Sequence, residues 1–160
     1  MTSTTGSKDR LERYLRDQHV PFHVQHHALA YSAQEVAASE HISGAHLAKV
    51  VVVVADGRTV MLVLPASHLV QVSKLAWLLG SNDARLADEG DFARLFPDCE
   101  LGAMPPFGNL YGLPVYVDPA VAKAESIVFR AGTHTDTMSM AYSDFARLVQ
   151  PSVLEIARHR

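Results

Sequence analysis

Apolar and polar positions at the start of the chain follow helical spacing. The apolar positions of this first helix are Leu11, Tyr14 and Leu15, and Ser7 is expected to cap it. Val20-Pro21 ends the helix, and the alternation from residue 22 to residue 27 predicts a half-buried strand. Residues 32–41 open with Ser-x-x-Glu, a capping box that predicts a second, short helix.

The most apolar run of the chain, residues 48–55, predicts a central strand. It contains five consecutive valines, and β-branched side chains disfavour a helix. A run that is apolar on both faces is typical of a strand inside a sheet. Asp56-Gly57 is a hairpin signal, so residues 59–64 are expected to pair with the valine strand.

The remaining pattern interleaves helices and strands without a regular period. Helices are expected at 67–79, at 88–96 and from 143 or 144 to 149, and strands at 113–117, 126–129 and 137–140. The stretch 98–112 is rich in glycine and proline, which predicts an irregular loop of defined shape. The pattern predicts a mixed α/β (α+β) fold with a mixed sheet.

Composition agrees with one globular domain. The chain has 160 residues and 48% hydrophobic residues, enough for a sizeable core. We expect a disordered lead at 1–7, a domain at 8–150 and a short tail at 151–160. The polar N-terminus lacks a signal sequence and the longest apolar run is too short to cross a bilayer, so a cytoplasmic protein without a membrane partner is expected.

Charge and cysteine content narrow the classes of function. Fourteen Lys and Arg against seventeen Asp and Glu give a net charge of −3, which argues against high-affinity binding of duplex DNA. The single cysteine, Cys99, excludes an internal disulfide. We interpret Cys99 as a buried thiol rather than a nucleophile.

Lys49 lies at the edge of the valine strand. Burying its ammonium costs free energy unless it reaches water or an anion. Two interpretations stay open: the side chain extends to solvent at the strand end, or it is directed into a cleft where a compact cation suits a phosphate.

Two further segments could carry chemistry. Residues 102–108 combine glycines and prolines, so they could present backbone groups rigidly to a ligand, although a plain connection has the same composition. His134 lies in a polar turn, either as an exposed loop residue or lining a pocket with Thr133 and Asp136 as neighbours. No nucleophile elbow, Walker loop or dinucleotide fingerprint occurs, so no cofactor is expected.

Histidine spacing disfavours a metal site. His26 and His27 would point to opposite faces of a strand. His41 and His46 straddle the turn at residues 43–44, and no cysteine pair supports them. We therefore expect no metal.

Four features in order carry a resemblance to a known family. They are the strand-edge Lys49 before the valine run, Gly102-x-x-x-Pro106-Phe107-Gly108, Ala131-Gly132-x-His134 and Asp144-Phe145. With these, the chain resembles the YbaK family, also described as the prolyl-tRNA synthetase-associated editing domain, over about residues 8–150. The resemblance implies a mixed, barrel-like sheet flanked by helices and a free-standing aminoacyl-tRNA deacylase that edits in trans.

The resemblance also implies site residues. Lys49 would engage the phosphate or ribose of the terminal adenosine, the Gly102–Pro106 loop would position the substrate and the attacking water, and His134 would help to hold the aminoacyl group. A ribose hydroxyl of the tRNA would support the reaction in place of a protein nucleophile. The substrate-binding residues would be Ala103, Met104, Pro105, Phe107, Gly108, Gly132, Thr133 and Asp136.

The family resemblance also implies binding partners and a substrate specificity. We expect weak, salt-sensitive binding of the tRNA 3′ acceptor end, with an aminoacyl-tRNA synthetase as a further partner. Small amino acids, with tRNA-Pro as one carrier, are the expected substrates, but Val50 stands where the alanine-specific branch has Asn after the lysine. This departure and the −3 charge support an alternative, a non-catalytic ligand-binding or regulatory module on the same fold.

Overall fold

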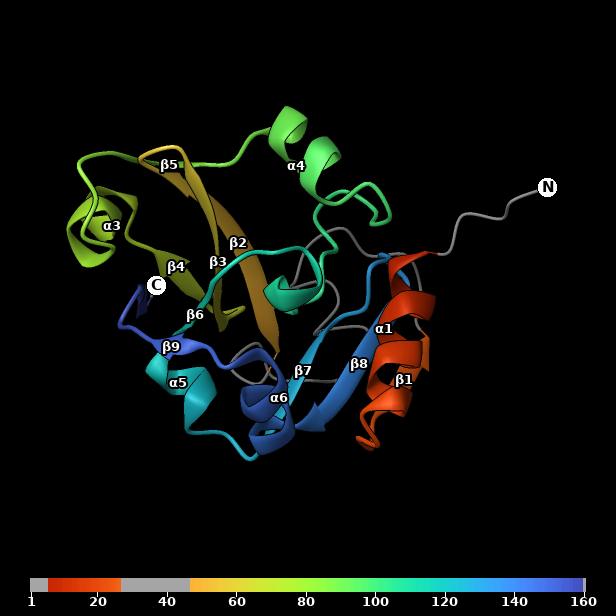
Figure 1. The fold of residues 1–160 in the computed structure, drawn as a ribbon. Coiled ribbons are helices and arrows are strands. Elements are labelled where there is room, and N and C mark those ends of the chain that lie inside the picture. The colour runs from red at the N-terminus through yellow and green to blue at the C-terminus, as the bar shows by residue number, and fades with distance from the viewer. Residues whose placement is uncertain (1–5, 27–46, 160) are drawn as a thin grey trace.

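The computed structural model describes residues 6–26 and 47–159 (Figure 1). The predicted capping-box helix at 32–41, together with His27, His41 and His46, lies outside the described residues. Within the described part, the mixed α/β class that the pattern predicted is confirmed.

A five-stranded mixed sheet forms the centre of the molecule. Its order is β5-β2-β3-β6-β9. The strands are β2 (Ala48–Ala55), β3 (Arg58–Pro65), β5 (Ala84–Leu86), β6 (Val115–Val117) and β9 (Ser152–Val153). The predicted hairpin of β2 and β3 is confirmed, with Lys49 opposite Leu64, while β6 runs parallel to β3.

The two faces of this sheet bury two separate apolar clusters. Met61 and Val63 of β3 belong to one cluster, and Leu62 and Leu64 to the other. Successive side chains of a strand point to opposite faces, so both faces of β3 are covered. This explains why the sequence of the hairpin is continuously apolar rather than alternating.

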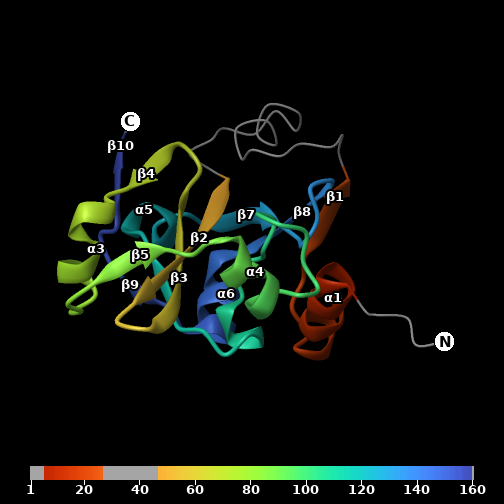
Figure 2. The ribbon, with the colours of Figure 1, turned by 90° about the horizontal axis from the view of Figure 1, so that it is seen from above.

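A second sheet carries the other half of the candidate site. It has the order β1-β8-β7 and consists of β1 (His23–His26), β7 (Ser126–Arg130) and β8 (Asp136–Ala141). A parallel bridge between Leu47 and Val128 joins it to the start of β2. Figure 2 shows β7 directly beside the start of β2.

The strands do not close into a barrel. The five-stranded sheet ends at β5 and β9, and the two-stranded sheet pairs β4 (His68–Val70) with β10 (Ala157–His159). The described sheets are therefore open, and the barrel-like closure that the family resemblance implied is not seen in them. Residues 151–160, expected as a short tail, contribute the strands β9 and β10.

The helices surround these sheets. They are α1 (Ser7–Asp17), α3 (Val72–Leu78), α4 (Glu89–Leu95), α5 (Pro119–Ala122) and α6 (Tyr142–Val149), with a 3-10 turn η1 (Gly108–Leu110). In Figure 1, α1 lies beside β1 and β8, and α3 lies at the opposite end of the molecule. No helix in residues 6–26 or 47–159 combines the length and the apolar character that a membrane crossing requires.

Three local predictions differ from the structure. Gly6 rather than Ser7 occupies the N-cap of α1, so Ser7 is its first helical residue. The helix predicted from Ser67 begins only at Val72, because residues 68–70 pair with β10 as a strand. All four residues of β1 are exposed, where the alternation predicted half burial.

Candidate functional site

Two segments far apart in sequence are joined by backbone hydrogen bonds at the start of β2. The Glu100 amide donates to the Gly132 carbonyl, and the Gly132 amide donates to the Ala103 carbonyl, both at 2.9 Å. The Glu100 side chain adds a third link, because its Oε1 accepts from the His134 amide at 2.7 Å. The glycine- and proline-rich loop and the polar turn therefore form one rigid unit.

His134 is a buried member of this unit. Its side chain and backbone are 6% exposed, and Nε2 lies 2.6 Å from the Leu101 carbonyl oxygen. A carbonyl only accepts, so Nε2 carries the proton and, in the neutral ring, Nδ1 is the acceptor nitrogen. Burial argues against the exposed loop histidine, and the side chain is not among those that line the Lys49 pocket described below, so the structure gives His134 a place behind the loop.

Arg130 holds the next carbonyl of the same loop. Its Nη1 donates to the Gly102 oxygen at 3.1 Å from the last position of β7. No sequence motif predicted a role for Arg130. The available signal was a cation at the end of an apolar strand, the same feature that drew attention to Lys49.

Lys49 shares a small pocket with this loop. The pocket has a volume of about 30 Å³, and its lining includes Lys49, Gly102, Met104 and Arg130. The structure therefore brings together Lys49 and Gly102, two of the site residues that the family resemblance implies. Lys49 and Arg130 also place two cations at one pocket. Cations at one pocket favour an anionic ligand group.

Gly102 needs the conformation that glycine allows. Its φ is +83°, and a Cβ added there would lie 3.8 Å from Cε1 of His134. The residue therefore turns the loop so that its carbonyl reaches Arg130, with the His134 ring close to the other side of the residue. Glycine adopts such positive φ values at little cost, unlike other residues.

The second half of the nominated loop enters the core. Residues 103–108 are all buried. The Phe107 ring centroid lies 5.6 Å from that of Phe129 and 5.4 Å from that of Phe145. A Cβ at Gly108 would lie 2.6 Å from a methyl carbon of Val115. The structure thus places Pro105, Pro106, Phe107 and Gly108 away from the lining of the Lys49 pocket and gives Phe107 and Gly108 packing roles.

Gly132 is the closest approach between the turn and α1. Its φ is +94°, and a Cβ there would lie 1.6 Å from Ser7 Oγ. The Ser7 amide also donates to the Asp98 carbonyl at 3.0 Å, so the first turn of α1 is held against both segments of the site. Position 132 therefore requires glycine for two reasons: its φ is positive, and Ser7 leaves no room for a side chain.

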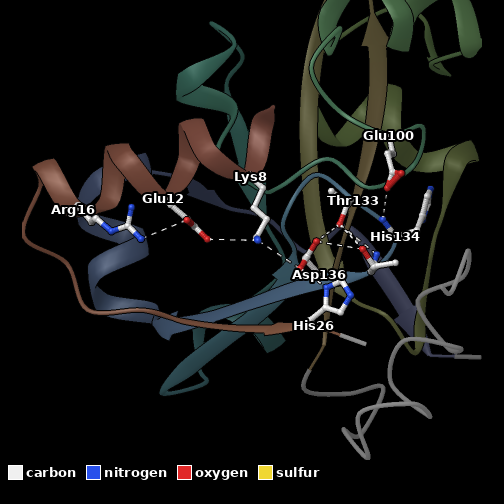
Figure 3. A network of polar contacts seen from close by, with 9 residues as sticks. Lys8, Glu12, Arg16, His26, Glu100, Thr133, His134 and Asp136 are labelled. Carbon is white, nitrogen blue, oxygen red and sulfur yellow. Dashed lines mark hydrogen bonds and ion pairs between the residues drawn. The ribbon is translucent and has the colours of Figure 1, made fainter. Parts of the chain in front are cut away.

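Asp136 anchors the turn to its surroundings (Figure 3). Thr133 Oγ1 donates to Asp136 Oδ2 at 2.6 Å, His26 Nδ1 donates to Oδ1 at 3.0 Å, and Lys8 Nζ lies 3.7 Å from Oδ1. Burial alone would raise the pKa of Asp136, but these hydrogen bonds and the Lys8 charge outweigh it, so the pKa lies below its ordinary value. Asp136 is therefore an ionised anchor for the turn that carries His134.

The basic face of α1 is paired with carboxylates. Lys8 and Arg16 both approach Glu12, at 3.9 and 3.4 Å, and Arg10 lies 3.6 Å from Asp98. These contacts agree with a solvated, ion-paired helix face rather than a nucleic-acid surface.

Cys99 lies in a setting that keeps its thiol protonated. Burial raises the pKa of Cys99, and its Sγ lies 3.3 Å from the Tyr111 hydroxyl oxygen. The thiolate is the nucleophilic form of cysteine. Cys99 is half-buried rather than fully buried as expected, and its raised thiol pKa gives no support to a nucleophile. Within residues 6–26 and 47–159, no group of three or more His, Cys, Asp or Glu residues could hold a metal ion.

Comparisons with known proteins identify the family. A family model described as the aminoacyl-tRNA editing domain matches residues 27–148. This match spans most of the chain, and the chain belongs to the aminoacyl-tRNA editing domain family.

Two curated relatives and one solved structure illustrate the match. The chain is 29% identical over 100 residues to the multifunctional Ser/Thr-tRNA deacylase ProXp-y of Escherichia coli (strain K12), across 62% of this chain and 59% of that protein's length. It is 32% identical over 120 residues to proline–tRNA ligase of Thiobacillus denitrificans, across 74% of this chain and 20% of the ligase. The crystal structure of a candidate trans-editing enzyme for prolyl tRNA synthetase superposes with a TM-score of 0.82 at 19% identity, covering 98% of this chain and 99% of that one. This last likeness shows the fold.

Proposed function

We propose that this protein hydrolyses the ester bond of mischarged aminoacyl-tRNA in trans. The observation that carries the proposal is the convergence of Lys49, Gly102 and the His134 turn at one edge of the sheet, in a chain of the editing-domain family. The relatives named for tRNA deacylation and for proline–tRNA ligation support the same class of substrate.

The reaction needs little from protein side chains. Water attacks the carbonyl carbon, the bond to the ribose oxygen breaks, and that oxygen takes up a proton to leave a free amino acid and a tRNA with a 3′ hydroxyl. An aminoacyl ester is already activated, so orientation and stabilisation of the developing oxyanion can supply catalysis.

The proposed roles follow from the contacts. Lys49 binds the phosphate or ribose region of the terminal nucleotide, since a compact ammonium suits an anion. The backbone of the Gly102–Pro106 loop positions the ester and the water at its Gly102 end, the part that lines the Lys49 pocket. His134 fixes the Leu101 carbonyl through Nε2, so it holds the loop that faces the aminoacyl group.

Substrate identity is proposed from the relatives and from one departure. The E. coli relative is named for serine and threonine, and Val50 replaces the Asn that the alanine-specific branch carries. We therefore place serine and threonine esters before alanine, with tRNA-Pro among the carriers and a synthetase as a partner that delivers the tRNA.

A panel of mischarged tRNAs tests the proposal. The protein is incubated with Ser-, Thr- and Ala-tRNA, each prepared on tRNA-Pro and on its cognate tRNA, and loss of the ester is followed over time. We expect hydrolysis of at least one seryl or threonyl ester well above the rate in buffer. If every ester survives while the protein still binds the tRNA 3′ end, the non-catalytic binding module replaces this proposal.

A further inference from the structure

A second cavity lies on the other side of the catalytic loop. It has a volume of about 460 Å³ and opens between α4 and residues 97–104. Phe92, Phe96, Leu101 and Met104 contribute apolar side chains to its wall. A volume of this size is within the range of sites that bind small molecules and cofactors.

The cavity adjoins the candidate site. Met104 lines both this cavity and the small Lys49 pocket. Glu100 and Leu101, which hold the amide and the imidazole of His134, also belong to its wall. The apolar space and the Lys49 pocket are therefore neighbours, with Met104 between them.

The charges on the two sides of Met104 have opposite sign. Lys49 and Arg130 line the small pocket, whereas Glu89 and Glu100 belong to the wall of the large one. The described residues that line the large cavity include no lysine or arginine. Carboxylates repel a phosphate but accept hydrogen bonds from amino groups, as they do from the exocyclic amine of cytosine.

We propose that this cavity, lined by Phe92, Phe96 and Met104, binds an amino-bearing nucleobase, adenine or cytosine, from the unpaired 3′ end of the tRNA. A nucleotide has an anionic backbone and a flat, uncharged base with amino donors, which matches the arrangement of cations on one side of Met104 and apolar walls with carboxylates on the other. Aromatic side chains bind unpaired bases by stacking. The inference deepens the proposed function, on which it rests.

Equilibrium binding of short oligonucleotides tests the base site without any ester chemistry. The trinucleotides CCA and UUU are titrated into the intact protein by isothermal calorimetry at low salt. We expect CCA to bind at least about tenfold more tightly than UUU, because the uracil base lacks the exocyclic amine. Equal affinity for the two trinucleotides overturns the inference.

Variants locate the binding. Ala93 is exposed on α4 and lines the cavity, so Ala93→Trp fills it, while Thr59→Trp fills a different cavity at the far end of the β2–β3 hairpin. We expect Ala93→Trp to weaken CCA binding at least about tenfold through the lost base contact, and Thr59→Trp to stay within about twofold. Leu101→Ala, which truncates a side chain that is 50% exposed, repeats the test should the tryptophan variant fail to fold.

Deacylation by the same variants separates the two proposals. If the wild type binds CCA selectively but hydrolyses no ester, the proposed function fails and the base site stands. If the wild type hydrolyses esters but Ala93→Trp and Leu101→Ala bind CCA normally, the base site fails and the function stands. If Ala93→Trp or Leu101→Ala raises the KM for the ester of one amino acid but not for that of another, while CCA binding is unchanged, the cavity holds the amino-acid side chain. That result overturns the inference.

Discussion

The two ends of β2 differ in the volume of the neighbouring cavity and in the polar groups that surround it. At the Lys49 end the pocket holds about 30 Å³, but two cations and a hydrogen-bonded loop converge on it. At the Ala55 end a cavity of about 770 Å³ opens, lined by residues that include Arg58, Thr59 and Tyr116. Volume alone would select the second end, whereas the convergent polar groups select the first.

The polar groups of the larger cavity already have a structural role. The Asp56 carboxylate accepts from the amides of Asn82 and Asp83 at 3.0 and 2.9 Å, which fixes the chain beyond the hairpin turn. At the Lys49 end, by contrast, the hydrogen bonds from His134 and Arg130 fix the Leu101 and Gly102 carbonyls of a loop that lines the pocket. The hydrogen bonds at the Ala55 end hold the chain after a turn, whereas those at the Lys49 end hold the loop beside the two cations, which is why the smaller pocket is the candidate site.

Removal of the His134 imidazole should have a large effect on the rate of hydrolysis. His134→Ala removes the donor that holds the Leu101 carbonyl, so the loop loses its fixed position. We expect kcat/KM for a susceptible aminoacyl-tRNA to fall at least about 100-fold, since misplacement of about 1 Å can have such an effect. Tyr116→Phe, in the larger cavity, should stay within about twofold in the same assay.

Two glycines offer a matched comparison of the two ends in stability. Gly132→Ala meets Ser7 and a positive φ, whereas Gly112→Ala meets only a positive φ, because nothing lies within 4 Å of its added Cβ. We expect Gly112→Ala to lower the free energy of unfolding by about 1–2 kcal/mol and Gly132→Ala by at least about 3 kcal/mol. Urea denaturation measures both free energies of unfolding. Equal losses would show that the Ser7 side chain can move away from the added methyl group without destabilising the protein.

The guanidinium of Arg130 should have a smaller effect on catalysis. Arg130→Met loses the hydrogen bond to the Gly102 carbonyl, and we expect kcat/KM to fall about tenfold, as for one charge-assisted hydrogen bond. Arg130→Lys should recover part of the rate. Arg147→Met, which removes an exposed cation of α6, serves as control, and a loss as large as that of Arg130→Met would point to a general charge effect.

The Asp136 anchor should show itself as a pH dependence of stability. Its pKa in the folded protein is lowered, so its contribution is present above the unfolded pKa of about 3.9 and is lost as pH falls through the lower, folded value. We expect Asp136→Asn to be less stable than the wild type at pH 5–7, with a gap that narrows below about pH 4. Thermal denaturation across this range measures the gap, and a gap independent of pH would remove the ionised anchor from the account.

Local sequence was sufficient where the chain is strongly patterned. The five valines and Asp56-Gly57 predict the β2–β3 hairpin, because burial on both faces and turn chemistry leave few alternatives. The helix predicted over residues 88–96 is present as α4, and Asp88 caps it, with its side chain accepting from the Asp91 amide at 2.9 Å.

Distant contacts explain what the sequence did not reveal. The helix expected from residue 67 is shortened because β4 pairs with β10, more than 80 residues away along the chain. Arg130 looked like an ordinary strand-end cation until its contact with Gly102 was seen. The motif loop was predicted as irregular, but its direction into the core depends on the Phe107, Phe129 and Phe145 rings, which no local pattern encodes.

The most direct test of the central claim compares the cations at the two ends of the hairpin. Lys49 and Arg58 lie on β2 and β3, one at the small pocket and one at the large cavity. Hydrolysis of seryl- and threonyl-tRNA is measured for the wild type, Lys49→Met and Arg58→Met at equal concentration. We predict a loss of at least about 100-fold for Lys49→Met and a change within about twofold for Arg58→Met. A Lys49→Met protein that hydrolyses at the wild-type rate would contradict the account.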